Sequence, residues 1–148
     1  MPNAHQLTRL TDLARDRREV AARKLGRSLS FLRESEARLG MLGQYCADYH
    51  TRLAQSAANG VSVEEMRNFR EFITRLEAAI GQQRQEVEAL QQGVTDCRNG
   101  WLAERRRKRA FEVLIERADL TEREAEARRL QKLVDEFAGR AASLRTAP

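Results

Sequence analysis

The feature that most constrains this chain of 148 residues is a long apolar repeat without an internal proline, because Pro2 and Pro148 stand at its ends. From Met66 onward, apolar residues recur at alternating steps of three and four for about sixty positions, as in the seam of a coiled coil. The polar residues in this seam are Gln83, Glu104, Lys108 and Glu122. Since nothing interrupts the repeat, it predicts one very long α-helix.

A second apolar repeat runs from Leu7 to Leu53, and the chain between the two repeats carries stop and start signals. Asn59-Gly60 is typical of the left-handed end of a helix, and Ser62 with Glu65 forms a capping box for the next one. A turn this short makes the two helices antiparallel. The predicted fold is therefore all-α, a single domain of residues 1–148. It consists of two long helices in an antiparallel coiled-coil hairpin, with helices at about 4–57 and about 62–144 and a turn at about 58–61.

In this hairpin, two residues that face each other across the helices have numbers whose sum is about 118. With this register, the apolar seam of the first helix faces that of the second along its whole length. The second helix then overhangs the first by about 30 residues beyond Phe111, or roughly 45 Å. Thr121 with Glu124 resembles another capping box, which allows a break near Leu120. Beyond it the apolar set shifts to Leu130, Leu133, Phe137, Ala141 and Leu144. An unpaired amphipathic helix is marginal in water, so we expect this segment to dock on a partner.

Several function classes are excluded by what the sequence lacks. No stretch approaches the run of about 18 apolar residues that spans a membrane, and no signal peptide is present, so we expect a cytoplasmic protein. His5 and His50 show no metal-ligand spacing, and the glycines form no phosphate-binding loop. We therefore predict no enzyme, no cofactor, no metal and no small-molecule substrate. Cys46 and Cys97 occupy seam positions roughly 37 Å apart in this register and are expected to be free thiols.

Two surfaces remain as candidates for binding. The run Arg105-Arg106-Arg107-Lys108-Arg109 is the densest charge in a chain of net charge +5, and it suits a protein partner, a nucleic acid or a solvated face. Nucleic acid is disfavoured, because the basic segment of a leucine zipper projects beyond a parallel zipper, whereas this run lies where antiparallel helix ends converge.

The second surface lies near the turn, where two helical stripes flank the seam. It is either extra core or a docking site, and Tyr45 is expected beside Phe72. Tyr45, Phe72 and Ala79 fall outside the seam and are the preferred contact residues. The full surface comprises Leu42, Tyr45, Tyr49, Phe72, Leu76 and Ala79.

The order of several short segments resembles the FliJ family of the bacterial flagellar type III export apparatus over nearly the whole chain. These segments are residues 7–14 (LTRLTDLA), Asn59-Gly60, Phe72-Ile73, Leu76-Glu77, Ala79-Ile80, Trp101 before the basic run, and Asp135-Glu136-Phe137-Ala138.

The resemblance implies a non-catalytic hairpin similar to the central stalk of rotary ATPases, inserted into the hexameric ring of the export ATPase. It also implies binding to the cytoplasmic domain of the export gate protein FlhA, recycling of export chaperones, and peripheral association with the inner membrane at the export apparatus. In that family the gate-binding surface uses the six positions near the turn named above, whereas Arg38 and Gln83 depart from its polar rim.

The unpaired stripe and the dense arginine predict where the ATPase ring is contacted. The residues expected there are Arg105, Arg106, Arg107, Arg109, Leu130, Leu133 and Phe137. Three alternatives stay open at this point: a stalk protein of a virulence-type III secretion system, a basic coiled-coil scaffold, and a nucleic-acid-binding coiled coil.

Overall fold

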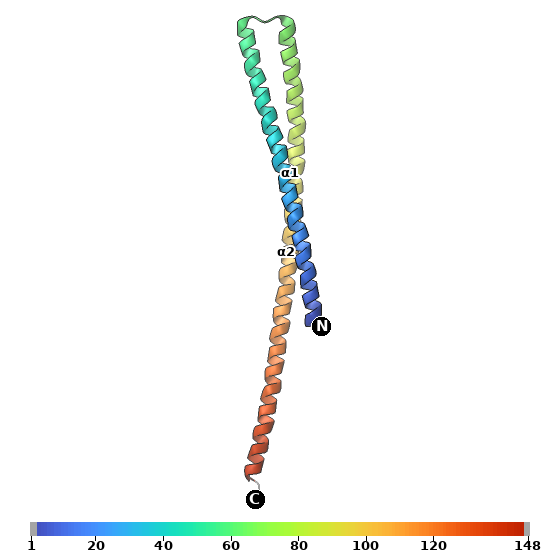
Figure 1. Ribbon diagram of the computed structural model, residues 1–148, viewed down its shortest axis with the longest axis vertical. Coiled ribbons are helices and arrows are strands. Elements are labelled where there is room, and N and C mark those ends of the chain that lie inside the picture. The colour runs from blue at the N-terminus through green and yellow to red at the C-terminus, as the bar shows by residue number, and fades with distance from the viewer. Residues whose placement is uncertain (1–2, 147–148) are drawn as a thin grey trace. The chain divides into compact units, whose positions relative to one another are not determined.

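The computed structural model describes residues 3–146, and within them it has two α-helices and no strand. Helix α1 spans Ala4–Asn59 and helix α2 spans Val63–Thr146, which confirms the predicted all-α class (Figure 1). Contacts group the chain into two units, to which both helices contribute. The terminal unit comprises Met1–Arg18 and Ala103–Pro148, and the turn unit comprises Glu19–Leu102. No described helix is both long enough and apolar enough to cross a membrane.

Side chains cap both helix starts, and at α2 the cap is the predicted pair of Ser62 and Glu65. The amide of Gln6 donates to Asn3 Oδ1 at 2.8 Å, and the amide of Asn3 donates back to Gln6 Oε1 at 3.2 Å. At the start of α2, the amide of Glu65 donates to Ser62 Oγ at 3.3 Å. These bonds satisfy backbone donors that the first turn of a helix leaves without partners, so local sequence defines where each helix begins.

In the turn unit, the chain reverses at Gly60, and α1 and α2 then pack antiparallel. Gly60 has a φ of 78°, a left-handed value that glycine adopts without the steric cost of a Cβ atom. The buried apolar side chains of this unit come from both helices and occupy seam positions. They are Cys46, Ile73, Val87 and Val94. The predicted antiparallel hairpin is therefore confirmed, and its core is a single seam.

One layer of this seam is polar. Ser35 is only 1% exposed, and Gln83 Nε2 donates to Ser35 Oγ at 2.8 Å and to the Ser35 carbonyl at 3.1 Å. This pair has the register that the sequence predicts. Because a buried hydroxyl needs a hydrogen-bond partner, the pair favours this register over one that slides Ser35 against an apolar residue.

In the terminal unit, the first turns of α1 pack on α2. Leu7 and Ala14 are 4% and 1% exposed, and an ion pair joins Arg17 Nη2 to Glu104 Oε1 at 3.2 Å. Leu10, which the repeat places in the seam, is 39% exposed, so the seam prediction is wrong there. The contact between the helices is thin in this unit, because small and charged residues supply much of it.

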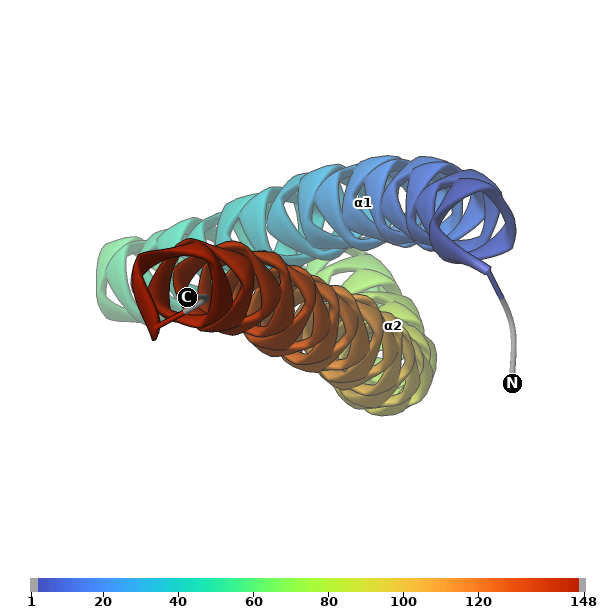
Figure 2. The same ribbon diagram turned by 90° about the horizontal axis from the view of Figure 1, so that it is seen from below.

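Helix α2 does not break near Leu120, although the sequence allowed it to do so (Figure 2). The Thr121 hydroxyl donates to the Arg117 carbonyl at 2.9 Å, so Thr121 lies inside the helix and does not cap a new one. Every residue from Asp119 to Arg140 is exposed. Glu122 and Ala125 of the predicted seam are therefore exposed, because they lie beyond the residues that the first turns of α1 bury.

Candidate functional site

The turn-proximal surface, which comprises Leu42, Tyr45, Tyr49, Phe72, Leu76 and Ala79, is drawn from both helices of the turn unit. The rings of Tyr49 and Phe72 lie 4.4 Å apart between centroids, at an interplanar angle of 47°. The sequence predicted Tyr45 beside Phe72, but the ring contact is made by Tyr49, a seam residue that faces α2. Aromatic pairs of this kind contribute about 0.5–1.5 kcal/mol beyond their buried area, so Tyr49 has a structural role.

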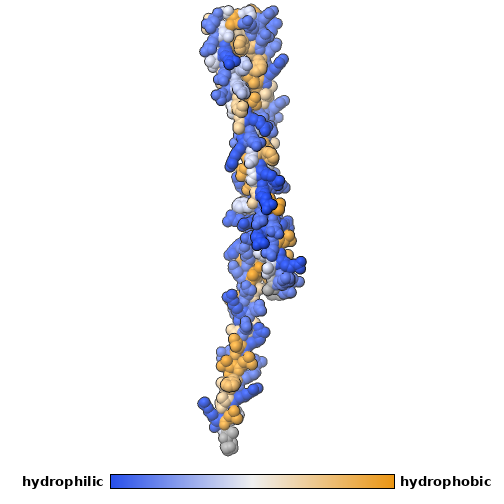
Figure 3. Space-filling view, in the orientation of Figure 1, coloured by the Kyte–Doolittle hydropathy of each residue, from blue (hydrophilic) through white to orange (hydrophobic). Residues whose placement is uncertain are grey.

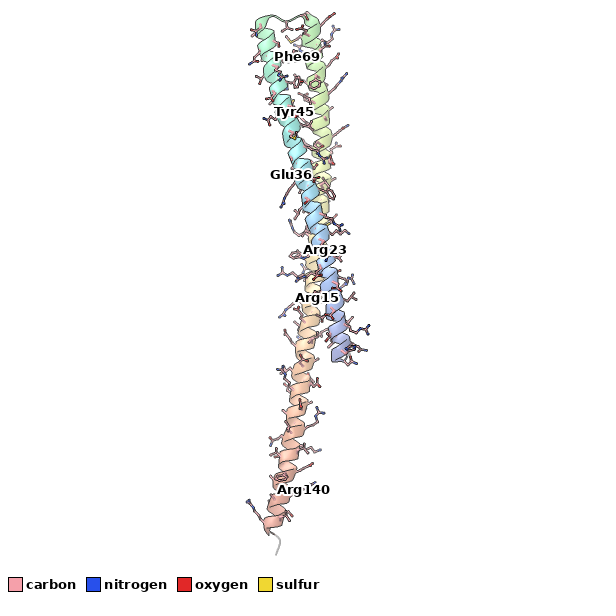
Figure 4. The ribbon with its side chains drawn as sticks, in the orientation of Figure 1. Arg15, Arg23, Glu36, Tyr45, Phe69 and Arg140 are labelled. Atoms are coloured by element: carbon pink, nitrogen blue, oxygen red, sulfur yellow. The ribbon has the colours of Figure 1, made fainter. Side chains whose placement is uncertain are left out.

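The exposed members of the turn-proximal surface are Tyr45, at 50%, and Phe72, at 40%. Leu42, Leu76 and Ala79 are half-buried, and Figure 4 shows Tyr45 on α1 and Phe69 on α2 in this region. The surface is thus core on its inner side and accessible on its outer side. Tyr45 is the residue most available to a partner, because half of its side chain is in solvent.

A cation covers part of the same surface. The Arg52 guanidinium carbon lies 5.2 Å from the centroid of the Tyr49 ring, within cation–π range. The Tyr49 ring therefore contacts both Phe72 and Arg52, and a partner that approaches this side meets a positive charge beside an aromatic pair.

The basic run of the terminal unit is interleaved with carboxylates. Lys108 Nζ lies 3.2 Å from Glu112 Oε1, and Arg109 Nη1 lies 3.5 Å from Glu112 Oε2 and 3.7 Å from Glu116 Oε1. The hydrogen bond from Lys108 lowers the pKa of the Glu112 carboxyl from its ordinary value of 4.5. Residues 104–116 hold five cations and three glutamates, a local excess of two positive charges. That is a weak field for phosphate binding, since affinity for DNA rises with the number of phosphates neutralised.

Exposed apolar side chains gather near the end of α2. They form the C-terminal stripe, which we define as Leu130, Leu133, Val134, Phe137 and Leu144. Each is at least 58% exposed, and Figure 3 shows the apolar colour concentrated along this segment. At 3.6 residues per turn, the stripe points roughly 70° away from the seam that α2 presents to α1 in the same unit. The two directions overlap in part, because Leu133 lies 18 residues, or five turns, after the seam residue Ile115. The stripe is set apart chiefly because α1 does not cover this segment.

An apolar hollow lies beside the seam in the terminal unit, where α1 begins. Leu7 shares its lining with Leu114, Ala118 and Ala125 of α2, and polar contributions come from Arg117, Thr121 and Glu122. On α2 the lining begins three residues beyond Phe111, the residue that the predicted register places opposite Leu7, and it ends at Ala125. The hollow adds apolar surface between the basic run and the C-terminal stripe.

The structure also groups residues that the sequence did not connect. Cys46, His50 and Glu77 form the one set of three potential metal ligands found among the described residues. The prediction that His50 has no metal-ligand spacing is wrong, because Cys46 lies four residues before it on the same helix face. That spacing was visible in the sequence, whereas Glu77 joins the set only when the two helices pair.

These observations define an antiparallel two-helix coiled coil whose longer helix ends in an exposed apolar stripe. The family described as "Flagellar FliJ protein" matches residues 3–147. The flagellar FliJ protein of Escherichia coli (strain K12) is 37% identical over 136 residues, and that of Salmonella typhi is 35% identical over 136 residues, each covering 92% of both chains. The chain belongs to the flagellar FliJ family and is a component of flagellar protein export.

Proposed function

We propose that this protein is a non-catalytic, stalk-like component of the export apparatus that binds the ring of the export ATPase through its terminal unit. The contact residues are Arg105, Arg106, Arg107 and Arg109 of the basic run and Leu130, Leu133 and Phe137 of the C-terminal stripe. The observation that carries the proposal is the exposure of the stripe. Phe137 and Leu144 are 76% and 79% exposed on a segment that α1 does not cover, and such a surface is unfavourable in water without a partner.

The test replaces Leu130, Leu133 and Phe137 together with glutamine, which removes the apolar stripe and keeps a good helix former at each position. The measurement is the rate of ATP hydrolysis by the purified export ATPase with and without the protein. We expect the stimulation to be lost while the circular dichroism of the variant keeps its helical signal.

The matched control changes the opposite face of the same segment. Arg128→Gln with Asp135→Gln conserves net charge and lies roughly 180° from the stripe at 3.6 residues per turn. It should stimulate the ATPase like the unmodified protein. Equal stimulation by the stripe variant and this control would refute the proposal.

The second proposed contact is between the turn-proximal surface and the cytoplasmic domain of the export gate protein FlhA. Tyr45 and Phe72 are its accessible aromatic residues, and Ala79 is a small, half-buried residue about two turns after Phe72 on α2. Aromatic side chains with an exposed edge are typical anchors of protein interfaces. Through the two contacts, one protein would connect ATP hydrolysis to the gate, assist the recycling of export chaperones, and lie in the cytoplasm at the inner membrane.

Tyr45→Ala separates docking from folding, because Tyr45 is half exposed and the ring contact of this surface belongs to Tyr49. We expect weaker capture of the purified gate domain with an unchanged melting temperature. Phe31→Ala is the control, since Phe31 is 57% exposed on the same helix and lies outside the surface. If Tyr45→Ala lowers the melting temperature and binding in parallel, the residue is core and the contact is not supported.

A further inference from the structure

Three side chains from two helices converge beside the seam of the turn unit. One ligand atom from each of Cys46, His50 and Glu77 lies within 4.8 Å of those of the other two, and His50 Nε2 is 3.5 Å from Glu77 Oε1. Cys46 and His50 are four residues apart on α1 and so share one helix face, while Glu77 reaches them from α2.

The burial of the three side chains is graded from the seam outward. Cys46 is 8% exposed, whereas the side chains of His50 and Glu77 are 54% and 59% exposed. The sulfur therefore forms the closed inner side of the cluster, and the imidazole and carboxylate form an outer side open to water. An ion can enter from solvent, and a water molecule can complete its coordination.

The contact between His50 and Glu77, an ion pair only when the imidazole is protonated, accounts for only part of this arrangement. An exposed pair of this kind contributes little to stability, and it makes no use of the thiol. A thiolate, an imidazole and a carboxylate together are the donor set of a divalent transition metal such as Zn²⁺, whereas Mg²⁺ and Ca²⁺ prefer oxygen ligands.

The distances suit such an ion after small side-chain rotations. Metal–ligand bonds of about 2.0–2.3 Å in tetrahedral geometry place ligand atoms roughly 3.4–3.6 Å apart. The His50–Glu77 pair is already at 3.5 Å, and the outer limit of the cluster is 4.8 Å. The required convergence is thus about 1 Å, which exposed His and Glu side chains achieve without moving the backbone.

We propose that Cys46, His50 and Glu77 bind one Zn²⁺ ion, which links α1 to α2 beside the turn-proximal surface. On binding, the Cys46 thiol loses its proton to solvent and coordinates as the thiolate, His50 coordinates as the neutral imidazole, and Glu77 as the carboxylate. The ion clamps the two helices at the layer next to the Tyr49–Phe72 pair. This site is independent of the proposed binding to the ATPase and to the gate.

Cobalt provides the test, because Co²⁺ occupies zinc sites and a bound thiolate gives it a charge-transfer absorption band. The reduced full-length protein is titrated with Co²⁺ under anaerobic conditions, and Zn²⁺ is then added. We expect a thiolate–cobalt band that saturates at one equivalent and disappears when Zn²⁺ displaces the cobalt. Zn²⁺ alone should raise the melting temperature.

Each ligand has a matched control in the same chain. Cys46→Ser should abolish the band, whereas Cys97→Ser should retain it. His50→Gln and Glu77→Gln change exposed positions and should leave the apo fold intact, yet weaken cobalt binding by about tenfold or more, while His5→Gln should have no effect. Absence of the band in the unmodified protein, its persistence in Cys46→Ser, or equal binding by His50→Gln and His5→Gln would each overturn the site.

Discussion

The polar layer formed by Ser35 and Gln83 leads to a quantitative prediction about the stability of the turn unit. Gln83→Ala removes the two hydrogen bonds to Ser35, at 2.8 and 3.1 Å, and leaves a hydroxyl that is 1% exposed without its partner across the seam. Hydrogen bonds of this kind contribute about 0.5–1.5 kcal/mol each, so the expected cost is about 2 kcal/mol in the free energy of unfolding. For a unit of this size, that lowers the melting temperature by roughly 10 °C.

The assay is thermal and urea unfolding followed by circular dichroism, with Gln85→Ala as the control. Gln85 is an exposed glutamine two residues away on the far side of α2, so its replacement removes the same side chain without any contact to Ser35. We expect Gln85→Ala to unfold at or slightly above the temperature of the unmodified protein, because alanine favours helix.

A double-mutant cycle with Ser35→Ala isolates the interaction itself. The coupling energy between Ser35 and Gln83 should be about 1 kcal/mol or more, since residues that share a hydrogen bond are not additive. If Gln83→Ala unfolds together with Gln85→Ala, or if the effects of Ser35→Ala and Gln83→Ala simply add, the polar layer does not stabilise the register and the reasoning is refuted.

Two further predictions concern the backbone and the pH dependence. Gly60→Ala should destabilise the hairpin by about 1 kcal/mol, because the backbone there has a left-handed φ of 78°. Gly81→Ala should stabilise it by about 0.5–1 kcal/mol, because Gly81 lies inside α2 and no atom lies near the added Cβ. The midpoint of urea unfolding measures both effects. If both substitutions shift the midpoint in the same direction, the conformational argument fails. The hydrogen bond from Lys108 lowers the pKa of folded Glu112 below 4.5. The ionised Glu112 carboxylate therefore stabilises the folded protein above pH 4.5, and this stabilisation is lost as the pH falls below that value. The melting temperature of Glu112→Gln should therefore depend less on pH than that of the unmodified protein between about pH 3 and pH 7, and identical pH profiles would contradict this assignment.

The sequence predicted the helices and their starts because the signals for them are local. The capping boxes of Asn3 and Ser62 involve residues three positions apart, and the seam is a repeat within each helix. The same local character explains why the sequence left a break near Leu120 open. A threonine followed by glutamate three residues later occurs both at helix starts and inside helices. The hydrogen bond from the Thr121 hydroxyl to the Arg117 carbonyl shows that Thr121 lies inside the helix.

What the sequence did not predict depends on contacts between helices. The position of Glu77 beside Cys46 and His50 follows from the register and from side-chain rotamers, neither of which a one-dimensional pattern contains. The ring partner of Phe72 has the same origin, because Tyr45 and Tyr49 lie one turn apart and only the packed structure distinguishes them. The candidate surfaces were found as residue sets, but their division into core and accessible parts required the structure.

The C-terminal stripe lies on a segment that α1 does not cover, and this has a thermodynamic consequence. A ligand that binds the seam of one helix must displace the other helix from it, so binding of that ligand competes with folding of the hairpin. A ligand on the stripe of Leu130 and Phe137 meets a face that α1 does not cover in the terminal unit. Such a ligand has nearly equal affinity for the zipped and the opened hairpin, and linkage then gives it little effect on the equilibrium between them. Binding at the C-terminal stripe and the stability of the hairpin are thus thermodynamically independent, so a substitution can change one without changing the other.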